Sequence, residues 1–313
     1  MRRLLTRLKQ VLTAMPRKVR VIVAVVVVGL CFYYLGSSLW RGMQQVDLSQ
    51  LRVRAGPLLL ALGLYTASTL IGGLCWSLIL EGLGQRRPLR ANVKVHLRAN
   101  IAKYLPGYAW QILGKAYLCG QQGLPAWTVG LGIGLEFLCV ILTGIWVALL
   151  TIPDLWLHGW GLSALAVWRW PGASVLAVLL IGFPHVLAYA LSHAAGWRQR
   201  PTGITIHGAP LRMMLLLMIL AWFILGLALY SLVTALYPLP TADLPAVTFS
   251  WAASAILSLV VIFVPMGIGV KEGVLTFLLG HSLPAALAAV VAVLARVVSI
   301  VSEALCFTLA EKL

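Results

Sequence analysis

The segment YLPGYAWQILGK, residues 104–115, places a Pro-Gly break inside a chain that is otherwise strongly apolar. Proline interrupts a helix, and lipid offers no partner to the backbone groups that are freed. Non-helical backbone within a membrane is tolerated where protein buries it or where it lines a water-filled cavity. We therefore expect Pro106 and Gly107 to form the tip of a re-entrant helical hairpin. The alternative is a proline kink in one continuous helix.

The composition indicates a membrane protein. Hydrophobic residues make up 61% of the 313 residues and charged residues only 10%, whereas a soluble domain carries about 25% charge. We expect an all-α polytopic membrane protein with about six to eight membrane-embedded helical elements, since a spanning helix needs about 20 apolar residues. The clearest apolar runs are residues 21–40, 57–80, 126–152, 171–195, 211–237 and 285–309, with a shorter run at 247–264.

The chain is expected to form one membrane domain, residues 21–313, behind a basic amphipathic leader, residues 1–20. No stretch outside the apolar runs is long enough for a separate catalytic domain. The leader places its leucines on one helical face and its arginines on the remainder, which suits the cytoplasmic surface of an anionic membrane. The first apolar run spans a bilayer fully, so it is not read as a cleaved signal peptide.

The distribution of Lys and Arg predicts the topology. The net charge is +16, and basic residues concentrate in the leader and in the loops 84–100 and 196–212. The loops 153–161 and 237–245 contain aspartate but no Lys or Arg. By the positive-inside rule, the basic loops and both termini face the cytoplasm. We expect a multi-pass protein of the inner (cytoplasmic) membrane that contacts anionic lipid headgroups and no nucleic acid.

A weak internal repeat relates residues 104–126 to residues 263–285. In each copy a proline, Pro106 or Pro265, precedes a second proline in a Leu-Pro-Ala by the same spacing. The second copy contains a glycine break at Gly267 and Gly269. Paired Gly/Pro-interrupted segments in two halves of a chain point to an inverted repeat around a transporter binding site. A chance match of two prolines and an alanine is the alternative.

Ionisable residues occur at depths where lipid disfavours them. A charge at a helix centre costs about 2.5–3.5 kcal/mol on insertion scales, so these residues must be paired or hydrated. One interpretation is a buried ion pair between Glu136 and Arg296 that fixes helix register. We favour a polar cavity for a charged substrate, although Lys103 and Lys115 could instead anchor helices at the interface. The candidate substrate-binding residues are Arg98, Lys103, Tyr104, Lys115, Glu136, Lys271, Glu272, Arg296 and Glu303.

No pattern in the sequence indicates catalysis. The six histidines and five cysteines lack metal-ligand spacing, and neither a nucleotide-binding loop nor a nucleophile triad is found. We therefore expect no enzyme activity, no metal and no cofactor.

Three segments together resemble the lysylphosphatidylglycerol synthase transmembrane-region family: NIAKYLPGYAWQILGKAYL, GLEFL and VPMGIGVKEGVL. The resemblance covers roughly residues 20–310. It implies about eight membrane elements with re-entrant segments and movement of lipid between leaflets. Two positions depart from the family pattern, because Lys115 stands where arginine is frequent and Met266 replaces a glycine. We expect the transport module alone, without an aminoacyl-transferring synthase domain.

The sequence thus favours a lipid translocator for an amphiphile with an anionic or zwitterionic headgroup, such as a phospholipid or a polyprenyl-phosphate-linked sugar. Lys103, Lys115 and Lys271 would meet phosphate, and the remaining charges would line a polar path. Transport would be passive or coupled to an ion gradient. The alternative is a non-transporting scaffold that holds a lipid-modifying synthase or glycosyltransferase as its partner.

Overall fold

The computed structural model describes residues 53–104, 109–193, 206–261 and 269–312. Within these ranges the chain forms helices and no strand. The expected leader, the first apolar run and the residues Pro106, Gly107, Pro265 and Gly267 lie outside the described residues.

Six helices in the described ranges are long and apolar enough to cross a membrane. This confirms an all-α polytopic membrane protein. The largest difference from the predicted bounds occurs in one helix, which begins before Pro171 and contains both Pro171 and Pro184 in its interior. Proline is tolerated inside membrane helices, where neighbouring groups satisfy the freed backbone. The six are α3 (Ala55–Gly82), α6 (Ala126–Thr151), α8 (Ser163–His193), α9 (Gly208–Thr234), α10 (Leu244–Val260) with the turn before it, and α12 (Ala285–Lys312).

A pair of helices flanks each Pro-Gly segment, and the two helices of each pair form a hairpin. Helix α4 (Leu89–Ile101) and the short turn η2 (Ala102–Tyr104) precede residues 105–108, and α5 (Ala109–Gln121) follows them and packs on α4. Helix α10 precedes residues 262–268, and α11 (Val270–Leu279) follows and packs on α10. Each hairpin lies between two long helices in the chain, so the order α3-α4-α5-α6 is repeated as α9-α10-α11-α12. The short helix α7 (Asp154–Gly159) and α8 connect the two halves.

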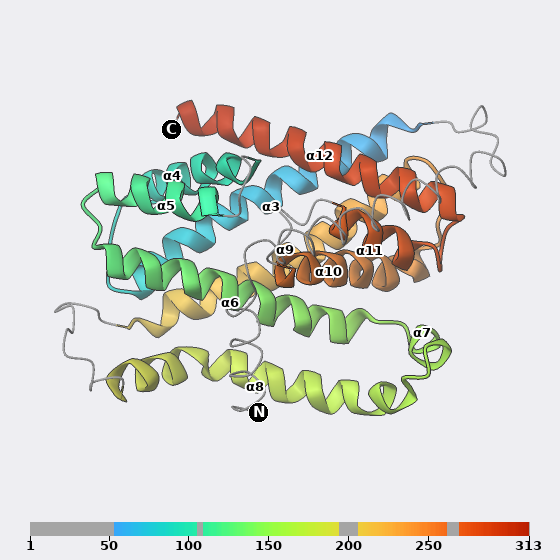
Figure 1. Cartoon of the computed structure of the whole chain (residues 1–313), viewed down its shortest axis with the longest axis horizontal. Coiled ribbons are helices and arrows are strands. Elements are labelled where there is room, and N and C mark those ends of the chain that lie inside the picture. The colour runs from blue at the N-terminus through green and yellow to red at the C-terminus, as the bar shows by residue number, and fades with distance from the viewer. Residues whose placement is uncertain (1–52, 105–108, 194–205, 262–268, 313) are drawn as a thin grey trace, which may run out of the picture.

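The two halves are inverted with respect to each other. Helices α3 and α9 are antiparallel, since the Arg54 N–H donates to the Ala235 carbonyl at one end and the His207 N–H donates to the Gly82 carbonyl at the other. The α4–α5 hairpin therefore starts from the end where α3 finishes, and the α10–α11 hairpin starts from the opposite end (Figure 1).

The packing repeats with the same inversion. Helix α12 contacts α3 and α4, just as α6 contacts α9 and α10 in the other half. The described elements thus form the inverted arrangement that the two proline spacings predicted. How the two Pro-Gly tips approach each other remains a prediction, because both tips fall outside the described residues.

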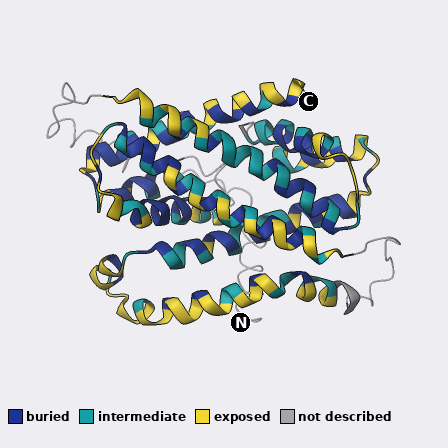
Figure 2. Ribbon diagram, turned by 180° about the vertical axis from the view of Figure 1, so that it is seen from behind, coloured by how far each residue is buried: buried dark blue, intermediate teal, exposed yellow. Residues whose placement is uncertain are grey.

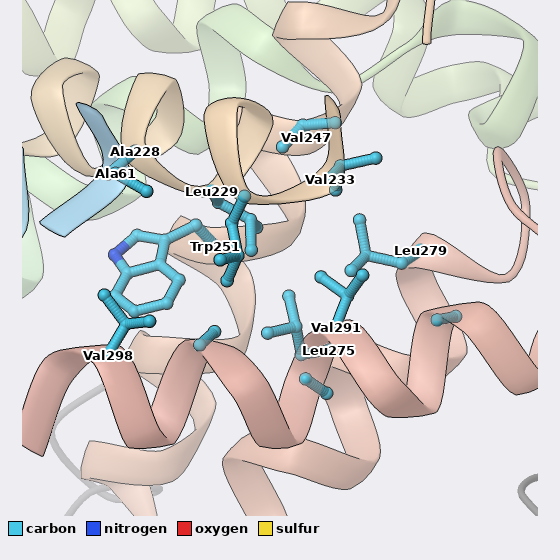
Figure 3. Close-up of a cluster of buried hydrophobic side chains, with 14 of the residues drawn as sticks. Ala61, Ala228, Leu229, Val233, Val247, Trp251, Leu275, Leu279, Val291 and Val298 are labelled. Atoms are coloured by element: carbon cyan, nitrogen blue, oxygen red, sulfur yellow. The ribbon is translucent and has the colours of Figure 1, made fainter. Parts of the chain in front are cut away.

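The main core lies where the two halves meet. Trp251 of α10 lies among Ala61 of α3, Leu229 of α9 and Val298 of α12 (Figure 3). By contrast, α8 is mostly exposed and lies at the edge of the molecule (Figure 2). Its apolar side chains Val178 and Ile181 are 68% and 69% exposed, which suits a helix face in contact with lipid.

We expect the end of the bundle where α3 finishes to face the cytoplasm. The loop after α3 carries Arg86 and Arg87, α9 carries Arg212 near its start, and α12 finishes at the same end with Lys312. In a cysteine-free background, Thr241→Cys at the other end should react with a membrane-impermeant maleimide added outside intact cells. Gln121→Cys and a tag after residue 313 should be protected. External labelling of the tag, with Thr241→Cys protected, would show the opposite orientation.

Candidate functional site

A cavity of about 370 Å³ lies between the two hairpins and is partly open to the outside of the protein. One hairpin contributes Lys103 and Gln111, and the other contributes Ser258 and Lys271. The remaining wall comes from the middles of the long helices, including Tyr65 of α3. The inverted fold thus brings residues next to both Pro-Gly breaks to one space at mid-length of the bundle.

Most of the predicted site residues converge on this cavity. Six of them line it, and Glu272 lines a small adjoining cavity together with Lys271 and Arg296. They come from five different elements, η2, α5, α6, α11 and α12. The six that line the main cavity are Lys103, Lys115, Glu136, Lys271, Arg296 and Glu303.

Lys115 belongs to a buried cluster and not to an interfacial anchor. Its Nζ lies 2.5 Å from Oε2 of Glu136 and 3.2 Å from Nδ1 of His96. The same histidine nitrogen lies 3.4 Å from Oε1 of Glu136. Nζ also lies 4.1 Å from the ring centroid of Trp76, and Lys115 is only 2% exposed. These contacts supply the partners that the charge of Glu136 requires in the membrane.

Arg296 pairs with a residue of its own half. Its guanidinium donates to Oε1 of Glu272 at 3.2 Å, and Oε2 of Glu272 accepts the backbone N–H of Gly269 at 2.8 Å. Gly269 has a φ of 83°, which favours glycine, and it caps the start of α11. The ion pairs that the structure shows therefore link Glu136 and Arg296 to hairpin residues, in place of the Glu136–Arg296 pair considered from the sequence.

The same type of contact occurs in both halves with the charges exchanged. In the first half, the hairpin helix α5 supplies the cation and the long helix α6 the carboxylate. In the second half, α11 supplies the carboxylate and α12 the cation. A third ion pair, Lys103 with Glu303, joins the hairpin of the first half to the long helix of the second.

Lys271 differs from the other cations of the site. Among the described residues no carboxylate lies within ion-pair distance of it, and its Nζ lies 3.6 Å from the ring centroid of Trp251. A ring face attracts a cation but does not neutralise it. Counting the charged residues that line the two cavities gives four cations and three carboxylates, so 4 − 3 leaves one excess positive charge in the described part of the site.

Arg98 is not among the charged residues that line the two cavities. Its guanidinium forms two hydrogen bonds of 2.8 and 2.7 Å to the carboxylate of Glu311, and both side chains are substantially exposed. The side chain of Tyr104 is outside the described residues.

Sequence reasoning missed three residues of the site. Tyr65 and Trp251 line the cavity, and neither the hydroxyl of Tyr65 nor the indole N–H of Trp251 has a hydrogen-bond partner among the described residues. His96 contacts Lys115 and Glu136, which line the cavity. The available signal was a polar atom in an apolar run for Tyr65 and Trp251, and a histidine in the basic loop 84–100 for His96. Each of these signals is weaker than a charge inside an apolar run.

No protein-family model matches this chain, and no curated protein matches it. The resemblance to the lysylphosphatidylglycerol synthase transmembrane-region family therefore stays a prediction.

The Lys115–Glu136 pair allows a thermodynamic test. Lys115→Met should lower the free energy of unfolding by about 3–5 kcal/mol, because it leaves a buried carboxylate without its main partner. The double variant Lys115→Met with Glu136→Met should lose less than the single variant, since an apolar replacement of a buried pair is often neutral. Unfolding in detergent would measure both.

The exposed Arg98–Glu311 pair serves as the control. Removing either of its members should cost only about 0–1 kcal/mol. Strictly additive losses at Lys115 and Glu136 would show that the two side chains do not stabilise each other.

Proposed function

We propose that this protein translocates an amphiphilic lipid with an anionic or zwitterionic headgroup between the leaflets of a membrane. The observation that carries the proposal is the excess positive charge of a cavity located at mid-length of the bundle between two inverted hairpins. An unneutralised cation within a membrane is costly. A substrate anion would offset that cost at the point where a headgroup must cross.

The size of the cavity supports binding of a headgroup alone. Sites for small molecules are about 300–1,000 Å³, so about 370 Å³ accommodates a headgroup and excludes a whole diacyl lipid. The acyl chains would remain in the bilayer beside the protein. Apolar wall residues such as Phe137 and Leu225 suit the glycerol and ester region that joins headgroup to chains.

The inverted arrangement supports a route between the leaflets. In transporters built from inverted repeats, the site lies at the repeat interface and one element moves against the other. Here each hairpin is joined to the long helix that follows it by an ion pair, Lys115–Glu136 or Glu272–Arg296. We propose that the two hairpins act as opposite gates of the site and that transport is passive or coupled to an ion gradient.

The scaffold hypothesis accounts less well for Lys271. In a non-transporting scaffold, the three ion pairs of the site would serve stability. A cation without a carboxylate partner, such as Lys271, would have no such role. The resemblance to flippase-like domains also favours translocation. We propose the cytoplasmic membrane as the location, and phospholipids or polyprenyl-phosphate-linked sugars as the substrate class.

Replacing Lys271 tests this function. Purified protein would be reconstituted into vesicles, and the movement of fluorescent phospholipids would be followed by quenching of the outer leaflet. Lys271→Gln should slow translocation by about tenfold, the equivalent of losing about 1.4 kcal/mol of interaction. Lys312→Gln, at the exposed end of α12, is the matched control and should leave the rate unchanged. Wild-type movement no faster than in protein-free vesicles would contradict translocation of these lipids.

A further inference from the structure

Four polar groups in the wall of the cavity lack a hydrogen-bond or ion-pair partner among the described residues. Lys271 lacks a carboxylate partner, and the hydroxyl of Tyr65 and the indole N–H of Trp251 lack hydrogen-bond partners. The fourth is Oε2 of Glu303, which accepts no hydrogen bond although Oε1 pairs with Lys103. Buried polar groups without partners are rare, and each calls for an explanation such as an absent ligand.

Three of these groups form one subsite. The Tyr65 and Trp251 rings pack edge to face with centroids 5.3 Å apart, and Lys271 lies over the Trp251 ring. They come from α3, α10 and α11, so both halves of the protein contribute. All three can donate a hydrogen bond, and one carries a full positive charge. This combination suits the non-bridging oxygens of a phosphate.

Glu303 forms the complementary subsite. An ionised carboxylate only accepts hydrogen bonds, so Oε2 requires a group with an N–H or O–H. Glu303 lines the same cavity as Lys271. The cluster of Lys115, Glu136 and His96 is different, because the charges there already contact each other.

We propose that the cavity selects headgroups that combine a phosphate with a hydrogen-bond donor. The phosphate binds Lys271, Tyr65 and Trp251, and an ammonium N–H or a hydroxyl donates to Oε2 of Glu303. Ethanolamine and glycerol headgroups meet both requirements, whereas the trimethylammonium of choline has no N–H to donate. This inference rests on the proposed function and adds the chemical basis of its selectivity.

The test compares three lipids that differ only in their headgroup. Phosphatidylethanolamine, phosphatidylglycerol and phosphatidylcholine with the same fluorescent acyl chain would be followed separately in vesicles that contain the wild-type protein. The first two should move about tenfold faster than phosphatidylcholine. Equal rates for all three would overturn the selectivity while leaving translocation intact, and no movement of any lipid would overturn both.

Two variants separate the subsites. Glu303→Leu removes the acceptor, whereas glutamine would keep a carbonyl oxygen that accepts hydrogen bonds. The preference over phosphatidylcholine should therefore fall toward unity. Glu311→Leu on the same helix is the matched control and should keep the preference. Tyr65→Phe removes a donor to phosphate, so it should slow all three lipids by a similar factor and preserve their order. A full preference in folded Glu303→Leu, judged by its thermal unfolding, would exclude Glu303 as the acceptor.

Discussion

A charge within a lipid bilayer must be paired or hydrated, and the arrangement of this protein follows from that constraint. The long helices α6 and α12 each carry a charge near their middle, Glu136 and Arg296. Neither helix can place its charge against lipid. In each half, a hairpin supplies the opposite charge, Lys115 or Glu272. The hairpins are therefore electrostatic partners of the long helices as well as interruptions of the chain.

The ion pairs determine the net charge of the cavity wall. The ion pair that joins each hairpin to its long helix is neutral, and so is the pair Lys103–Glu303 that joins the halves. The wall of the cavity would then be neutral but for Lys271. In the proposed transport, this single cation would hold an anion without binding it so tightly that it cannot leave.

The sequence predicted the long helices well, because length and apolar composition determine whether a segment can span a membrane. It also predicted the charged site residues from their depth, since Glu136 and Arg296 stand in apolar runs where charge is costly. The pairing could not be predicted, because it depends on which helix faces which after folding. Tyr65 and Trp251 were missed because an aromatic residue in an apolar run is usually part of the core. Arg98 precedes Lys103 by less than two helical turns, but the structure pairs it with exposed Glu311.

The accessibility of introduced cysteines measures whether the cavity between the hairpins is hydrated and positively charged. In a cysteine-free background, Ser299→Cys places a thiol in the wall of the cavity. Ser254→Cys, fully buried on α10 and outside the lining, is the reference. We expect the Ser299→Cys thiol to react readily with small methanethiosulfonate reagents, and several-fold faster with an anionic reagent than with a cationic one. A Ser299→Cys thiol as unreactive as the reference would contradict a hydrated site and favour a dry scaffold.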